Sequence, residues 1–165
     1  MNTFQILKQD HKKLSQLFNE VLHTSSRSIK TRENLFEEIK SLLDHHALME
    51  EDILYPVLKD ISTSHLQTAE SYEEHHLMKI VLKELNTWQK NNDDWLGKMK
   101  TLKDLVEHHA QEEEKTLFPM AEKLLNQTQL NDIQDQIARY KNHYEQQKAH
   151  PGLWGKVYMA MNNSD

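Results

Sequence analysis

The sequence predicts an all-α protein, specifically an antiparallel up-down four-helix bundle with an additional C-terminal helix and tail. Only three Gly and three Pro occur in 165 residues, so breakers of helices are rare. Apolar residues recur at helical spacing through nearly the whole chain. Short polar segments separate the periodic stretches, and short connections between long helices favour antiparallel neighbours.

Five stretches carry apolar residues at helical spacing and end at turn or capping residues. They cover about residues 3–24, 30–59, 64–90, 94–125 and 128–147. The first four are expected to form one domain, residues 1–126. Residues 127–165 are expected to form a helix, ended by Pro151 and Gly152, and an apolar tail that packs on the bundle. A dimer or partner contact is the alternative for this tail.

Composition excludes several classes of protein. The chain has no Cys, which rules out disulfides, Cys-ligated iron–sulfur clusters and Cys-based zinc sites. Its formal net charge is −6 and no basic block is present, which argues against nucleic acid as a partner. The N-terminus lacks the pattern of a signal peptide, and no apolar run is long enough for a membrane span. We therefore expect a soluble, cytoplasmic protein with no membrane association.

An internal repeat carries the candidate chemistry, and it accounts for much of the excess of 11 His. Asp10-His11 in the first half corresponds to Glu74-His75 in the second. His-His-Ala-x-x-Glu-Glu followed by Leu-aromatic-Pro occurs at 45–56 and again at 108–119. Each half is thus a helix with one His followed by a helix with His-x-x-x-Glu.

Residues four apart lie on one face of a helix, so each His-x-x-x-Glu pair presents an imidazole and a carboxylate to the same point. The lone His of each half lies on the apolar stripe of its helix. Carboxylates on an apolar stripe are costly without a cation, and bundle interiors can hold dimetal sites. The predicted metal ligands are His11, His46, Glu50, His75, His109 and Glu113.

The other residues of the repeat are expected to have structural roles and not to bind metal. His45, His76 and His108 neighbour the predicted ligands and are expected outside the ligand set. Tyr55 and Phe118 are expected to be walls of the pocket, and Pro56 and Pro119 to kink their helices beyond the ligands. The remaining histidines are expected on the surface: His23, His65, His143 and His150.

These motifs, over about residues 5–125, resemble the hemerythrin-like family with the HHE cation-binding domain. The resemblance implies a non-haem di-iron centre with bridging carboxylates and an oxo or hydroxo bridge. It also implies a small ligand, dioxygen, nitric oxide or peroxide, or a role in iron homeostasis or stress. Zinc and manganese are alternative metals, because the ligand types alone do not select one first-row ion.

The chain also departs from the oxygen-carrying hemerythrins. Lys79 stands where those proteins supply a fifth histidine, which favours redox, nitric-oxide or iron-handling roles over oxygen carriage. Their fourth-helix carboxylate aligns with Glu114, so Glu114 is the rival of Glu113, and His76 is a possible substitute ligand. An enzyme of peroxidase or nitric-oxide reductase type and a metal-dependent sensory or interaction module are the alternative functions.

Overall fold

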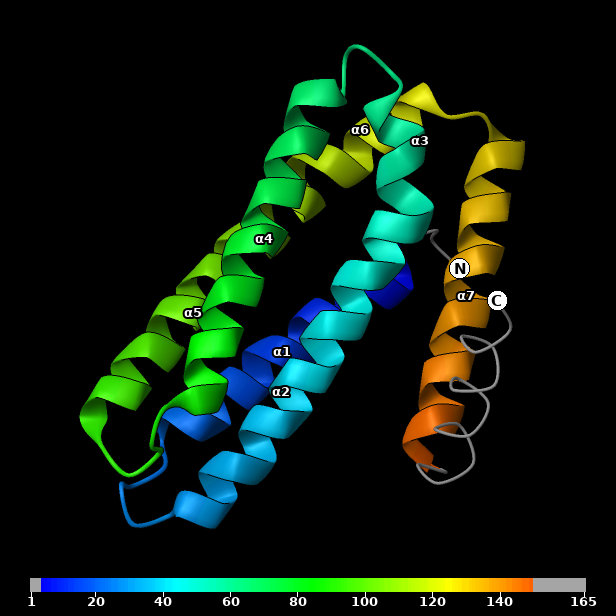
Figure 1. Ribbon diagram of the computed structural model, residues 1–165. Coiled ribbons are helices and arrows are strands. Elements are labelled where there is room, and N and C mark those ends of the chain that lie inside the picture. The colour runs from blue at the N-terminus through cyan, green and yellow to red at the C-terminus, as the bar shows by residue number, and fades with distance from the viewer. Residues whose placement is uncertain (1–3, 150–165) are drawn as a thin grey trace, which may run out of the picture.

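The computed structural model describes residues 4–149, and within that range every regular element is helical, as the sequence predicts (Figure 1). The tail expected to pack on the bundle, residues 150–165, lies outside the described residues. The elements are α1 (Gln5–Leu22), α2 (Ile29–Met49), η1 (Glu50–Leu54), α3 (Tyr55–Lys59), α4 (His65–Thr87), α5 (Asp93–Glu112), η2 (Glu113–Leu117), α6 (Phe118–Leu124) and α7 (Gln127–Ala149).

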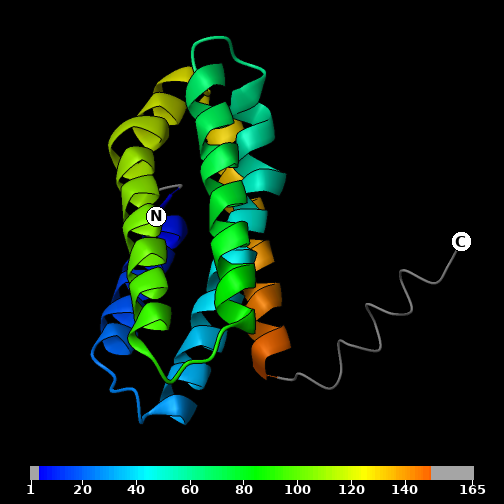
Figure 2. The same cartoon turned by 60° about the vertical axis from the view of Figure 1, so that its left-hand side comes forward.

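The bundle has four sides. α1 packs against α2 and α5, and α4 packs against α5 and α3. The second side consists of α2, η1 and α3, and the fourth consists of α5, η2 and α6. In each of these sides a short π-helical segment joins two α-helices into one continuous rod. Figures 1 and 2 show the rods running up and down with short connections between them.

The two π-helical segments occupy equivalent places in the repeat. In each, the backbone N–H five residues after the glutamate bonds to the glutamate carbonyl, as in Tyr55 to Glu50 and Phe118 to Glu113. Pro56 and Pro119 follow directly, near the start of α3 and α6. Proline has no N–H to donate, so it interrupts the α-helical hydrogen-bond pattern. In each rod the interruption takes the form of a widened, π-helical turn just before the proline.

Two apolar clusters fill the interior. One contains Leu14, Phe18 and Phe36, and the other contains Leu7, Leu54 and Phe118, with further buried residues in each. Along α1, His11 lies between Leu7 of one cluster and Leu14 of the other. The predicted ligands are therefore flanked on both sides by buried apolar side chains.

Helix α7 lies against the rod of α2 and η1. Its residues Leu130, Ile133 and Ile137 join one apolar cluster, and Tyr144 joins the other. No helix within residues 4–149 is long and apolar enough to cross a bilayer.

A buried arginine ties two loops together at the end of the bundle where α2 begins. Arg32 is fully buried and donates to Thr24 Oγ1 at 2.9 Å, the Thr24 carbonyl at 3.0 Å and the Lys90 carbonyl at 2.6 Å. Its guanidinium also lies 5.8 Å from the centre of the Trp95 ring. This one side chain satisfies carbonyls of both the α1–α2 and the α4–α5 connection.

We predict that Arg32→Ala lowers the free energy of unfolding by about 2–4 kcal/mol, because it leaves buried carbonyls without donors and removes a buried side chain. Denaturant unfolding of the metal-free protein measures this loss. Arg27→Ala, at an exposed loop position, is the matched control and should change stability little. Equal stabilities for the two variants would contradict the role assigned to Arg32.

Candidate metal centre

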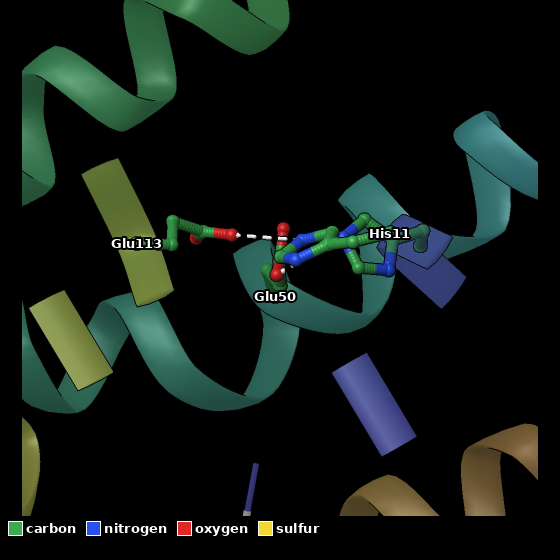
Figure 3. A group of neighbouring side chains, drawn as sticks. His11, Glu50 and Glu113 are labelled. Atoms are coloured by element: carbon green, nitrogen blue, oxygen red, sulfur yellow. Dashed lines mark ion pairs between the residues drawn. The ribbon is translucent and has the colours of Figure 1, made fainter. Parts of the chain in front are cut away.

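The structure brings all six sequence-predicted residues together in the bundle interior. His11 comes from α1, His46 from α2 and His75 from α4, while His109 lies near the end of α5. Glu50 and Glu113 are the first residues of η1 and η2. None is more than 7% exposed. Figure 3 shows His11, Glu50 and Glu113 pointing toward one another from different elements.

These side chains form two groups, each of which could hold a metal ion. Within each group the ligand atoms all lie within 4.8 Å of one another. The first group contains His11, His46, Glu50 and Glu113. The second contains Glu50, His75 and His109. Glu50 therefore belongs to both groups.

The two carboxylates face both groups through their oxygens. Glu50 Oε1 lies 3.2 Å from His46 Nε2, and Glu50 Oε2 lies 3.3 Å from His75 Nε2. Glu113 Oε2 lies 3.2 Å from His11 Nε2 and 3.5 Å from His109 Nε2. Each carboxylate thus reaches one histidine of each group, which is the arrangement that a bridging ligand requires.

The other ring nitrogen of each histidine faces an outer carboxylate. Glu114 lies 2.8 Å from His11 Nδ1, and Glu51 lies 2.9 Å from His75 Nδ1. In the same way, Glu74 lies 2.6 Å from His109 Nδ1, and Asp10 lies 3.5 Å from His46 Nδ1. A carboxylate at Nδ1 favours the tautomer with hydrogen on Nδ1, which leaves the lone pair of Nε2 directed inward.

The four carboxylates that face Nδ1 atoms form an outer ring around the centre, and they account for the acids of the repeat. The acid before each lone histidine, Asp10 or Glu74, supports the His-x-x-x-Glu histidine of its own half. The acid after each inward glutamate, Glu51 or Glu114, supports the lone histidine of the other half. Glu113 and not its rival Glu114 points into the centre, while Glu114 orients His11.

Several inward atoms are buried without a hydrogen-bond partner. They include His11 Nε2, His46 Nε2, Glu50 Oε1 and Glu113 Oε2, although each lies near an oppositely charged or polar atom. A buried polar atom without a partner costs about 1–3 kcal/mol. Imidazole nitrogens and carboxylate oxygens are ligands for first-row metal ions, so a cation among these atoms satisfies them together. The donor set therefore fits a metal.

In the metal-free centre, the carboxylates and imidazoles stabilise one another's charged forms. Burial opposes the charged form of His46, but Glu50 and Asp10 raise its pKa to about 10. Burial likewise opposes ionisation of Glu50, yet His46, His109 and His75 hold its pKa well below the usual range. Glu113, Glu50 and Glu74 overcome burial at His109 and raise its pKa well above normal. The proton on His46 thus supplies positive charge beside Glu50, where a metal ion would also supply it.

Sequence reasoning missed the part played by Tyr55. Its hydroxyl donates to Glu113 Oε1 at 2.8 Å and lies 3.4 Å from Glu50 Oε2 and 3.3 Å from His75 Nε2. Burial, and then the charges of Glu113 and Glu50, raise the pKa of Tyr55 well above its usual value. Phe118, its counterpart in the repeat, stacks parallel to His11 at 6.2 Å between ring centres and has no hydroxyl. Tyr55 is therefore a proton-bearing member of the centre, whereas Phe118 is a wall as expected.

The other histidines lie where the sequence analysis expects them. His76 is exposed, and the His108 side chain is 62% exposed. His45 is half-buried, with Nδ1 2.8 Å from the Ser41 carbonyl. The remaining surface histidines are exposed at positions 23, 65 and 143, while His150 lies outside the described residues.

Lys79, which stands at the place of the fifth histidine of oxygen carriers, remains at the edge of the centre. Its ammonium donates to both carboxylate oxygens of Glu51, at 2.8 and 3.0 Å. The lysine therefore supports the outer carboxylate of His75 and supplies no ligand of its own.

Comparisons with known proteins show what the chain and its fold resemble. The chain is 32% identical over 118 residues to a DNA nickase from Nostoc sp.. That alignment covers 72% of this chain and 33% of the nickase, so the chain spans about a third of that relative's length. A crystal structure of a hemerythrin HHE cation-binding domain-containing protein from Mycobacterium kansasii has the same fold. It superposes with a TM-score of 0.75 at 22% identity, covering 99% of this chain and 94% of the other.

The family model of the hemerythrin HHE cation-binding domain matches residues 2–121, which contain every histidine and glutamate of the two groups. Its description agrees with the buried donor atoms that a cation would satisfy. On this match the chain belongs to the hemerythrin HHE cation-binding domain family.

Proposed function

We propose that this protein holds two iron ions in the bundle interior and binds or responds to dioxygen, nitric oxide or peroxide, or serves iron homeostasis. The observation that carries the proposal is the position of Glu50, which belongs to both groups and directs one oxygen toward a histidine of each. A carboxylate shared in this way is a natural bridge between two cations.

The residues divide between the ions in a simple way. His11 and His46 would hold one ion and His75 and His109 the other, with Glu50 and Glu113 reaching a histidine of each pair. Iron bound by imidazole and carboxylate would supply one-electron chemistry and exchangeable positions for a small ligand. The protein contributes the outer carboxylates that orient each imidazole, and the two apolar clusters that limit water.

Reaction with small ligands tests this function. Protein loaded with Fe(II) without oxygen is mixed separately with nitric oxide, dioxygen and peroxide while the absorption spectrum is recorded. The proposal expects a new charge-transfer spectrum with at least one of these, and its absence in Glu113→Ala. Iron that binds but shows no spectral response to any of the three would contradict the small-ligand roles and leave iron homeostasis as the function.

The hydroxyl of Tyr55 favours one alternative, a di-iron enzyme of peroxidase or nitric-oxide reductase type. It is a buried proton donor 2.8 Å from Glu113, in a position where a reaction that consumes protons could draw on it.

For this enzyme we predict steady turnover of peroxide or nitric oxide, falling about 100-fold in Tyr55→Phe, the lower end of the range in which a positioned proton donor contributes about 10²–10⁴-fold. Iron content should remain as in the wild type. Tyr72→Phe is the matched control, because its hydroxyl bonds only weakly to the Glu51 carbonyl at 3.4 Å. Turnover that survives in Tyr55→Phe would argue against a catalytic hydroxyl, and no turnover in the wild type would exclude the enzyme.

A further inference from the structure

Helix α7, which lies beyond the residues matched by the family model, reaches the outer ring of the centre. Lys141 Nζ lies 2.5 Å from Asp10 Oδ1 across 131 residues of sequence. The Lys141 side chain is 21% exposed and that of Asp10 only 7%. A charged pair so little exposed to water is screened far less than a surface pair.

From Asp10, a series of contacts continues toward the inside of the metal centre. The second oxygen of Asp10 lies 3.5 Å from His46 Nδ1, and His46 Nε2 lies 3.2 Å from Glu50 Oε1. Asp10 therefore lies between Lys141 of α7 and the predicted ligand His46.

The equivalent acid in the other half of the repeat has no such support. Glu74 bonds to His109 and lies 3.8 Å from His108, and no lysine within residues 4–149 pairs with it. In the second half, the bundle therefore orients His109 through Glu74 without the help of a lysine. The contact from α7 is an addition made on one side of the centre.

The two halves of α7 dock in different ways. Leu130, Ile133 and Ile137 bury the first half in an apolar cluster. The second half combines apolar and polar contacts: Tyr144 joins the other cluster with its hydroxyl 3.2 Å from Ser41 Oγ, and Lys141 meets Asp10. The contact of Lys141 with Asp10 is the one that links this half to the predicted ligand His46.

We infer that Lys141 is a positioning residue for the metal centre, and that metal binding and docking of the second half of α7 strengthen each other. The inference rests on the proposed metal centre. Lys141 holds Asp10 against His46 Nδ1 and so helps to fix the ring orientation in which Nε2 faces the centre, and a metal on Nε2 would fix the same ring from its other side. By linkage, the docked helix favours metal by the same factor.

Hydrogen exchange of the full chain, with and without Fe(II) under anaerobic conditions, tests this coupling. Fe(II) should slow exchange at residues 138–148 by about fivefold or more in the wild type, the lower end of usual coupling between sites. Lys141→Met keeps the apolar stem but loses the charge, and it should lose most of this slowing. Lys141→Arg should retain it, because the cation is kept.

Lys148→Met is the matched control, since Lys148 is a more exposed lysine of the same helix, 3.7 Å from Glu38. It should respond to Fe(II) like the wild type. Exchange at residues 128–137 without metal should be unchanged in Lys141→Met, which shows that α7 is still docked.

Two failures are distinguishable. If the wild type binds no iron, the proposed centre and this inference fall together. If iron binds but exchange at residues 138–148 does not slow, or slows equally in Lys141→Met, the inference alone is wrong.

Discussion

Glu50→Gln is expected to prevent the protein from holding two metal ions. Glu50 is the residue common to both groups, and its oxygens face His46 and His75. A neutral amide replaces the shared anion with a weak ligand on one side and an N–H donor on the other. We expect the affinity for the metal pair to fall by more than the about 10- to 100-fold that loss of an outer carboxylate costs.

Metal content after reconstitution, with titration of metal-free protein, measures the effect of Glu50→Gln. Glu37→Gln is the matched control, because Glu37 is exposed on α2, the helix that continues into η1, and this variant should bind metal like the wild type. Glu51→Gln should fall between them, since Glu51 supports His75 through Nδ1. Two ions bound tightly by Glu50→Gln would show that Glu50 does not bridge them.

Metal affinity is expected to rise steeply with pH. In the metal-free protein the pKa of His46 is about 10, and the pKa values of His75 and His109 are also raised. His46 therefore carries a proton at neutral pH, and a ligand must lose its proton to bind metal. Affinity should therefore increase as pH rises toward the folded pKa values, by about tenfold per pH unit for each proton displaced.

Zinc, which has no redox chemistry, is the suitable probe, with its affinity measured between about pH 6 and about pH 8. Calorimetry in buffers of different ionisation enthalpy should also show proton release on binding. A pH-independent affinity without proton release would mean that the imidazoles are neutral before metal arrives. That result would contradict the ion pairing described for the metal-free centre.

The cluster of six inward residues could be predicted from sequence because its geometry is mostly local. His46 with Glu50, and His109 with Glu113, are four residues apart on a helix, and a repeat in register pairs the two halves. The outer acids were visible in the same repeat, but their assignment was not. Glu113 and Glu114 are adjacent, and only the packing against α1 shows that Glu114 takes His11 Nδ1.

The role of Tyr55 could not be predicted from an α-helical pattern. In an α-helix, a residue five positions after Glu50 lies roughly 140° around the axis from it. Within η1 the bond from the Tyr55 N–H to the Glu50 carbonyl spans five residues, which brings the tyrosine back to the inward face. Pro56 signals a disruption, but proline alone does not distinguish a kink from a widened turn.

Long-range polar contacts were also beyond the sequence. Lys141 meets Asp10 across 131 residues, and Arg32 meets Lys90 across 58. Lysine and arginine are common on exposed helix faces, so neither residue carries a local signal for burial. Only the packing of α7 on the bundle, and of one loop on another, selects these partners.

The most direct test of the central claim is metal content with an absorption spectrum of aerobically purified protein, compared with the variant His46→Ala plus His109→Ala. We predict two irons per chain and a near-ultraviolet charge-transfer band in the wild type, both lost in the variant. His76→Ala plus His108→Ala, at two exposed neighbours of the predicted ligands, should keep both. Failure of the wild type to retain metal after iron reconstitution, or unchanged iron in His46→Ala plus His109→Ala, would contradict the proposed centre.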